Sequence, residues 1–452
     1  MPKSATLTPS NPRQRSWTGT ILLLICAFAG LYHLHTINRD FPSHRSDLQP
    51  VKIGIQATLR GENPYSEDVT RQIQRAYYGR VLTPSDHVNQ MAYVYPPHTA
   101  VVLAFLAPFQ WETARRIFLV LAFFLTAAAV PAWIRISGAQ WRRRSVLIAV
   151  VGVLGSWPVI WALRLQQPTI LVAALIAVAC LLLREGHDTN AAVLLAFATI
   201  KPQLISILTL WLLLRAVLLR RHRFLLAFAA TTGVLLAIGT YLVPGWLAQW
   251  MRAGADLLVY THQQPTFQLL FGHWFGILLN LCFAAITLLY LWRARRCGPE
   301  SPEFGGAVGF ALAATLTLMP TDLPMIYNQI LLVPGCIFLI SSLPQQYFDR
   351  LARRIALALV GWGFLAQLIA AMGEGLSGKP GFWQLLPFEN LLLPPALAGS
   401  LALTSFLGWQ QAIRSRKTGR VPSPEEDFVA PAFRTGVQAE SLSKLRHERP
   451  SY

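Results

Sequence analysis

Residues 117–132 read IFLVLAFFLTAAAVPA, and residues 171–183 read LVAALIAVACLLL. Neither stretch has the polar face that a helix on the surface of a soluble protein turns towards water. Apolar runs of roughly 17–22 residues recur along the chain, and a helix of about this length crosses the hydrocarbon core of a bilayer. Because backbone polar groups cannot stay unpaired in lipid, these runs must be helical. The sequence therefore predicts an all-α integral membrane protein.

The composition supports this fold class, and the placement of charge argues against a nucleic-acid-binding protein. Of the 452 residues, 54% are hydrophobic and only 13% are charged, which is too apolar for an ordinary soluble protein. The formal net charge of +18 would suit nucleic-acid binding. The basic residues, however, cluster at alternate ends of the apolar runs, at 142–144, 220–223, 293–296, 350–354 and 414–420. Such clusters mark cytoplasmic loops that contact membrane lipids, and no nucleic-acid partner is expected.

Sorting the apolar runs by their flanking charge predicts about 12 transmembrane helices with both termini in the cytoplasm. The first run is interpreted as a retained anchor, because the small-residue triplet that resembles a cleavage site lies inside it. The predicted spans lie near 18–35, 116–136, 146–163, 169–184, 190–201, 203–218, 224–243, 273–292, 304–319, 328–343, 354–372 and 390–409. A membrane domain over 17–410 is expected between a cytoplasmic tail, 1–16, and a disordered cytoplasmic tail, 411–452.

Two sizeable loops are predicted on the extracytoplasmic side, over 37–115 and 244–272. The first loop is rich in acidic residues, since seven of the chain's 21 lie between Asp40 and Glu112. A membrane protein that concentrates carboxylates in one external loop is expected to carry out chemistry there.

The first loop is predicted to contain helices that do not span the membrane. The apolar run 99–110 is too short to span and contains Pro108, so an interfacial or re-entrant helix is expected there. Within 66–90, the spacing of Val69 and Ile73 predicts an amphipathic helix on the membrane surface. A plain solvated helix is the alternative.

Short motifs in this loop and in later helices carry a resemblance to a known family. They are Asp47-Leu48, Gly61-Glu62-Asn63-Pro64-Tyr65, Tyr95-Pro96-Pro97, Pro108, Leu163-Arg164-Leu165-Gln166-Gln167, Lys201-Pro202, Leu318-Met319-Pro320 and Tyr327-Asn328-Gln329. In this order, over residues 20–410, they resemble the bacterial polytopic glycosyltransferases of family 87. The resemblance implies the GT-C membrane fold and the activity of a polyprenol-phosphate-mannose-dependent α-mannosyltransferase. Two departures lie at Gln166 and Thr169, where the family usually has Gly and Asn.

The reaction implied by the resemblance is transfer of a hexose from a polyprenyl-phosphate-linked donor to a hydroxyl of a lipid or glycan acceptor, with inversion. It would take place on the outer side of the bacterial cytoplasmic membrane. An alcohol is a poor nucleophile, so a carboxylate must take its proton as the new bond forms. Asp47 stands where the family's catalytic aspartate lies relative to 61–65, and Asp40 is the second candidate for the base. The alternative role for Asp47 is a helix N-cap.

The leaving phosphate needs positive charge in a poorly hydrated site. Lys201 is the first candidate, because a lysine at the tip of a helical hairpin in the membrane is costly unless it is paired, although snorkelling to the interface is an alternative. Arg164 and Arg252 are the further candidates for binding the donor phosphate. The side chains expected to line the substrate cavity are Tyr65, Tyr95, Gln167, Asp322, Tyr327 and Asn328. No cofactor or metal is expected, because the histidines near Asp40 lack the spacing of metal ligands.

Two other functions stay open. A transporter or lipid flippase of the cell envelope would concentrate polar residues and broken helices near the bilayer midplane, often in paired repeats. Here the polar candidates gather at one face and no repeat is evident, which favours the transferase. A family member that has lost catalysis and serves as a partner subunit is the other alternative, suggested by the departures at Gln166 and Thr169.

Overall fold

The computed structural model describes residues 45–83, 86, 88–321, 325–341 and 391–405, together with the single residues 21 and 28. Apart from one pair of two-residue strands, the regular structure in these ranges is helical, which confirms the predicted all-α fold. Most of the predicted span 18–35, the whole of 354–372, both terminal tails, and the candidates Asp40 and Asp322 lie outside the described residues.

In the described part of the chain, three helices are long and apolar enough to cross a membrane. They are α5 (Trp111–Ile136), α11 (His222–Leu242) and α14 (His273–Arg293), which is extended by the short η3 (Ala294–Arg296). Six predicted spans coincide with shorter apolar helices: α8 (Thr169–Arg184), α9 (Asp188–Phe197) with η2 (Ala198–Ile200), α10 (Pro202–Leu218), α15 (Pro302–Leu318), η4 (Met325–Leu332) with α16 (Val333–Ser341), and Leu391–Ser405. These helices indicate a membrane protein, and the total of about 12 spans stays a prediction.

One predicted span is bent, and its two halves together are apolar enough to cross a membrane. The run 146–163 is divided into α6 (Arg143–Leu154) and α7 (Trp157–Arg164), which are bent by 56° relative to each other. Ser156 at the break is extended, and Pro158 stands in the first turn of α7, where its missing N–H breaks no helical hydrogen bond. The bend directs α7 onto η4, and this contact positions the turn that follows α7.

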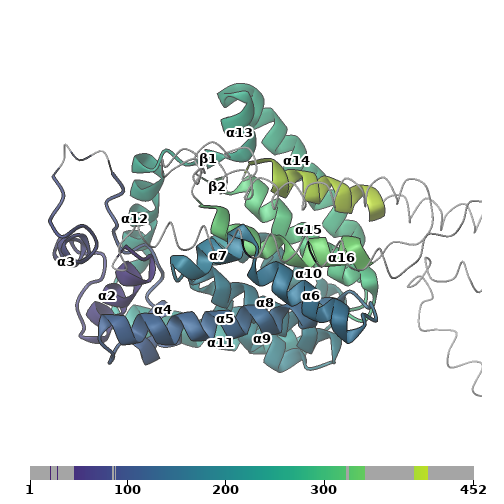
Figure 1. Cartoon of the computed structure of the whole chain (residues 1–452), viewed down its shortest axis with the longest axis horizontal. Helices are drawn as coiled ribbons and strands as arrows, with labels where there is room; N and C mark the ends of the chain where they lie inside the picture. The colour runs from purple at the N-terminus through teal and green to yellow at the C-terminus, as the bar shows by residue number, and fades with distance from the viewer. Residues whose placement is uncertain are drawn as a thin grey trace, which may run out of the picture.

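The apolar helices pack around one continuous core (Figure 1). α5 packs along α8, α8 packs along α9, and α9 contacts α11, while α15 lies against both α10 and α16. A Cβ atom added to Gly309 of α15 would lie 2.5 Å from the Cα of Gly335 in α16. Real Cβ atoms do not approach backbone this closely, so the α15–α16 contact requires glycine at position 309.

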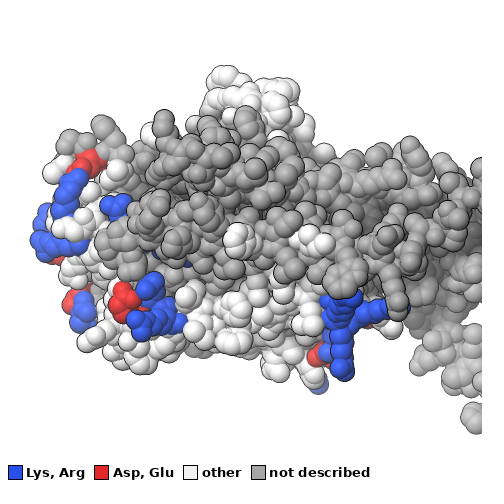
Figure 2. Space-filling model, viewed as in Figure 1, with Lys and Arg blue, Asp and Glu red and all other residues white. Residues whose placement is uncertain are grey.

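Charged side chains gather towards two ends of the molecule. On the face drawn in Figure 2 they lie at the end that holds α2, α3 and the start of α5, and again towards the opposite end of α5. The surface described between these ends is uncharged. α5 follows the same pattern, since Glu112 and Arg115 lie near its start and Arg135 near its end. This distribution is the one expected of a protein that crosses a bilayer along the direction of α5.

The two predicted loops contain short helices. The first contains α2 (Leu48–Leu59), α3 (Glu67–Tyr78), α4 (Thr99–Val102) and η1 (Ala104–Leu106). Because α4 and η1 are each at most four residues long, neither spans the membrane, as predicted for 99–110. The second contains α12 (Trp246–Tyr260), the strand β1 (Gln264–Pro265) and α13 (Thr266–Phe271). β1 pairs antiparallel with β2 (Pro320–Thr321).

The helix predicted within 66–90 is α3, but its apolar face is not on the membrane surface. Ser66 caps it by accepting a hydrogen bond from the N–H of Val69, and Gly79 ends it in the left-handed conformation, with φ +75°. Val69 and Ile73 are buried against α2 and Tyr93. The apolar face of α3 therefore packs inside the protein, and the prediction that it rests on the membrane surface is wrong.

Candidate active site

Asp47 lies where the segment before α2 meets the turn after α7. Its backbone N–H donates to the carbonyl of Leu165 at 3.1 Å, and Ser46 Oγ donates to the same carbonyl at 2.9 Å. Asp47 occupies the N-cap position of α2, but its side chain makes no capping hydrogen bond. The carboxylate is therefore available for another role.

The turn after α7 depends on a residue with positive φ. Gln166 has φ +49°, in the left-handed region that glycine adopts most readily. Its Nε2 donates to the carbonyls of Leu163 and Arg164, at 2.8 and 2.7 Å, and so satisfies acceptors at the end of the helix. A glutamine can thus stand where the family resemblance has glycine. The turn directs Gln167 towards Asp47.

Gln167 connects the candidate base to the candidate cation. Its Nε2 donates to Oδ2 of Asp47, and its Oε1 accepts from Nζ of Lys201 at 2.7 Å. Both Gln167 and Lys201 are buried. The half-buried carboxylate and the buried ammonium are therefore linked through one amide group.

Lys201 lies at the junction between η2 and α10, and its ammonium is held from several sides. Nζ also donates to Thr169 Oγ1 at 2.9 Å, and Thr169 donates in turn to Asn328 Oδ1 at 3.0 Å. The ring centroids of Tyr95 and Tyr327 lie 5.5 and 5.6 Å from Nζ, within the range of cation–π attraction. Lys201 is only 7% exposed, so its ammonium is paired inside the protein rather than extended to the interface.

Burial dominates the protonation of Asp47. Removal from water raises the pKa of its carboxyl to about 6, although the charge of Lys201, the hydrogen bond from Gln167 and the charge of Arg164 all act to lower it. A carboxyl with this pKa is ionised at neutral pH and accepts a proton more readily than an ordinary aspartate. The cluster can therefore take a proton at Asp47 and hold an anion beside Lys201.

A family model covers the part of the chain that supplies Gln167 and Lys201. It is described as Glycosyltransferase family 87 and matches residues 93–321, just over half of the chain. The chain belongs to glycosyltransferase family 87. No curated protein and no solved structure matches it. Membership indicates a transferase that takes a sugar donor and a glycan or lipid acceptor.

The matched segment of this family 87 protein does not include every residue of the cluster. Tyr95, Gln167 and Lys201 lie inside it, whereas Asp47 precedes it and Asn328 follows it. The hydrogen bond between Gln167 and Asp47 joins residues 120 positions apart. The fold thus assembles the site from residues before, within and after the matched segment.

The two arginine candidates occupy different places. Arg164 is buried, and it lies close enough to Asp47 for its charge to stabilise the carboxylate. Arg252 lies on α12 and its side chain is exposed. The structure brings Arg164, and not Arg252, to the Asp47–Lys201 cluster.

Tyr65 supports the site through the backbone of Tyr95. Its hydroxyl donates to the backbone carbonyl of Tyr95 at 2.7 Å, and its ring lies 5.6 Å from that of Tyr93. The ring of Tyr93 is in turn 5.9 Å from that of Tyr95. Tyr65 therefore holds the segment that presents Tyr95 to Lys201.

Two residues of the site were not predicted. Thr169 is completely buried and connects Lys201 to Asn328. A hydroxyl at the first position of α8, directly before the apolar run 170–183, was the signal available for it. Tyr77 lies at the end of α3, where the charges of Asp47 and Arg164 act on its phenol. In the sequence Tyr77 is only part of an apolar helix face, and no neighbouring pattern predicts that it lies at the site.

The described residues contain no group of three or more His, Cys, Asp or Glu side chains arranged to hold a metal ion. The histidines that the sequence places near Asp40 lie outside the described residues, at positions 33, 35 and 44.

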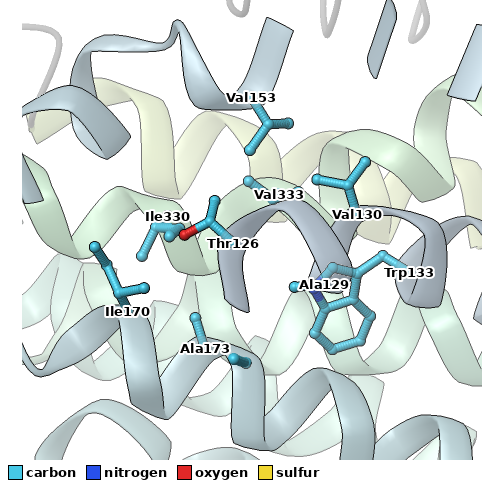
Figure 3. Close-up of a pocket in the computed structure, with 10 residues that line it drawn as sticks. Thr126, Ala129, Val130, Trp133, Val153, Ile170, Ala173, Ile330 and Val333 are labelled. Carbon is cyan, nitrogen blue, oxygen red and sulfur yellow. The ribbon is translucent and has the colours of Figure 1, made fainter. Parts of the chain in front are cut away.

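A small apolar cavity lies between α5, α6, α8, η4 and α16 (Figure 3). Its volume is about 10 Å³, enough for about one water molecule. Ile170 and Ile330 line it, and they follow Thr169 and Asn328 closely in the chain. The rest of the lining comes from α5, α6, α8 and α16 and carries no charged residue. The cavity has no group for acid–base chemistry, so the Asp47–Gln167–Lys201 cluster is the candidate active site.

Proposed function

We propose that this family 87 protein transfers a hexose, mannose by the family resemblance, from a polyprenyl-phosphate-linked donor to an acceptor hydroxyl on a lipid or glycan. The observation that carries the proposal is the buried Gln167 amide, which links the half-buried carboxylate of Asp47 to the buried ammonium of Lys201. This reaction needs a proton acceptor and an anion-binding cation close together, and the cluster supplies both.

Asp47 is the general base in this proposal. The acceptor hydroxyl gives its proton to the Asp47 carboxylate while its oxygen forms a bond to the anomeric carbon of the donor. The bond between that carbon and the phosphate oxygen breaks, and the electron pair leaves with the polyprenyl phosphate. Attack from the face opposite the phosphate inverts the anomeric configuration.

Lys201 and Arg164 bind the donor phosphate and stabilise the charge that it gains on leaving. An ammonium has three donors, and in the described structure two of those on Lys201 bond to Gln167 and Thr169. The third is available for a phosphate oxygen. Arg164 offers a planar guanidinium that can hold two phosphate oxygens at once. Tyr95 and Tyr327 flank Lys201, Asn328 is linked to it through Thr169, and all three would line the substrate cavity.

We infer that the site faces the extracytoplasmic side of the bacterial cytoplasmic membrane, in a GT-C-like fold of about 12 spans with both termini in the cytoplasm. Two observations support this placement. Asp47 lies at the end of the molecule that holds α2 and α3 (Figure 1). The basic run 142–144 lies between the end of α5 and the first turn of α6, and the run 220–223 lies between the end of α10 and the first turn of α11.

The proposal is tested with purified protein in lipid nanodiscs, supplied with radiolabelled polyprenyl-phosphate mannose or glucose and a lipid extract as acceptor. Wild type should transfer label from one donor, and Asp47→Asn should lose about 10²–10⁴-fold in rate. Asp68→Asn removes an exposed carboxylate on α3 and should keep full activity. Transfer by wild type from neither donor would overturn the proposed reaction, and full activity of Asp47→Asn would overturn the assignment of the base.

A further inference from the structure

The helix α12 (Trp246–Tyr260) has an inner face that contacts the first loop. Trp250 Nε1 donates to the backbone carbonyl of Val94 at 3.0 Å. Gln249 Oε1 accepts from Nδ2 of Asn63 at 2.6 Å. Because Val94 directly precedes Tyr95, α12 contacts the segment that presents the Tyr95 ring to Lys201.

The outer face of α12 is apolar and exposed. Leu247, Met251 and Leu258 are 53%, 63% and 38% exposed, and their spacing of four and seven residues places them in one stripe along the helix. Arg252 and Asp256 are also exposed and form a polar edge further round the helix, away from this stripe. A stripe of large apolar side chains facing water is unfavourable, so this face is expected to be covered.

The position of α12 in the chain indicates what covers it. It begins four residues after α11 ends, and α14 begins 13 residues after α12 ends, so it lies where two helices long enough to span a membrane reach the same surface. Tyr241 and Trp274, near the ends of these two helices, are 85% and 81% exposed, as is typical of aromatic residues at the membrane interface. Figure 1 shows α12 running across the direction of α5 at the end of the molecule that holds α2 and α3.

We propose that α12 is an interfacial helix whose stripe of Leu247, Met251 and Leu258 inserts into the headgroup–acyl boundary of the bilayer. Through Trp250 and Gln249 the same helix attaches the first loop to the membrane surface. The occupant of the stripe is lipid because α12 lies in the connection between α11 and α14, whose exposed apolar side chains face the bilayer if these helices span it. Contact with the bilayer thereby positions the segment that presents the Tyr95 ring to Lys201. The inference does not depend on which reaction the site performs.

The contact with lipid is tested by labelling single cysteines with bimane in a full-length variant that lacks the native cysteines, reconstituted in nanodiscs. Met251→Cys reports on the stripe, and Asp256→Cys, on the polar edge of the same helix, is the matched control. A lipid with a nitroxide near its headgroup should quench the label at position 251 several-fold more than that at 256, and aqueous iodide should show the reverse order. Leu258→Cys repeats the test should the first variant fail to fold.

Two results would overturn the proposal. Equal quenching by iodide at positions 251 and 256 would show that the stripe faces water. Protection of position 251 from both quenchers would show that protein, such as a second copy of the chain, covers it.

The attachment of the first loop is tested by hydrogen–deuterium exchange on the protein in nanodiscs. Trp250→Phe removes the hydrogen bond to Val94 and should raise the exchange rate of the amides at 92–95 by at least several-fold. Trp274→Phe changes an exposed indole on α14 and should leave these amides unchanged. Unchanged exchange in Trp250→Phe would overturn the proposed role of α12 in positioning the loop.

Discussion

The Nζ atom of Lys201 lies 2.7 Å from Oε1 of Gln167, and the amide nitrogen of the same side chain donates to the carboxylate of Asp47. An amide has distinct donor and acceptor ends, so Gln167 fits between the two charged groups in only one orientation. A direct salt bridge would hold the ammonium and the carboxylate against each other. The interposed amide keeps Asp47 able to accept a proton and Lys201 able to bind an anion.

The pH dependence of the transferase reports on the burial of Asp47. The reaction needs the carboxylate, and burial raises the pKa of this group from 3.8 to about 6. kcat/KM should therefore be constant above this pKa and fall about tenfold for each pH unit below it. Initial rates measured between about pH 4.5 and 8 check this, and a rate that stays constant to the acid end of the range would contradict it.

Substitution of Gln167 should shift the pH below which the rate of the reaction falls. Gln167→Glu places a second negative charge beside Asp47, and a like charge raises the pKa of a carboxyl further. The pH at which the rate is half-maximal should rise by about one unit or more. Gln166→Gly is the matched control, because glycine adopts the observed φ of +49° without strain. In this variant the pH of half-maximal rate should be the same as in wild type. Identical pH profiles for Gln167→Glu and wild type would show that the amide does not contact the base.

Removal of the cation should slow the reaction and also alter the base. Lys201→Met keeps an unbranched side chain but takes away the charge, and should lower kcat by about 10²–10³-fold. Because the charge of Lys201 lowers the pKa of Asp47, the residual activity should require a higher pH than in wild type. Steady-state rates across pH measure both effects. A Lys201→Met variant with wild-type kcat would exclude Lys201 from binding the leaving phosphate.

Thr169 is expected to position Lys201 through its hydroxyl. Thr169→Val keeps the shape of the side chain but removes the acceptor for Nζ and the donor to Asn328. A hydrogen bond to a charged group contributes about 1.5–3 kcal/mol, so kcat should fall about 10–100-fold. Thr169→Ser keeps the hydroxyl and should restore most of the rate. Equal losses in the two variants would mean that the methyl group, and not the hydroxyl, is important.

The α15–α16 contact should be sensitive to a single methyl group. Gly309→Ala forces a Cβ against the Cα of Gly335 and should destabilise the protein by about 1–3 kcal/mol. Gly399→Ala, in the helix Leu391–Ser405, meets nothing within 4 Å and should be neutral or stabilising. Thermal unfolding of the two variants in the same detergent measures the difference. A melting temperature for Gly309→Ala at or above that of Gly399→Ala would contradict the observed packing.

Much of the fold could be predicted from local sequence, because the length and periodicity of an apolar run determine whether it forms a helix. The run 117–132 is inside α5, and 99–110 forms only short helical turns that cannot span the membrane. Lys201 was also a candidate from sequence, since a charged residue within an apolar run needs a partner. Asp47 was a candidate because its position relative to 61–65 resembles that of the family's catalytic aspartate. Their common location could not be derived from either segment alone.

The tertiary structure decided which faces and groups meet. Val69 and Ile73 mark an apolar helix face, but only packing places that face against α2 while leaving the apolar stripe of α12 exposed. Gln167 and Thr169 become part of the site because the bend before α7 and the left-handed Gln166 direct them towards Asp47 and Lys201. Helical periodicity is a property of neighbouring residues, and the sequence by itself determined it. Contacts between residues 120 positions apart depend on how complete helices pack, and the tertiary structure alone determined them.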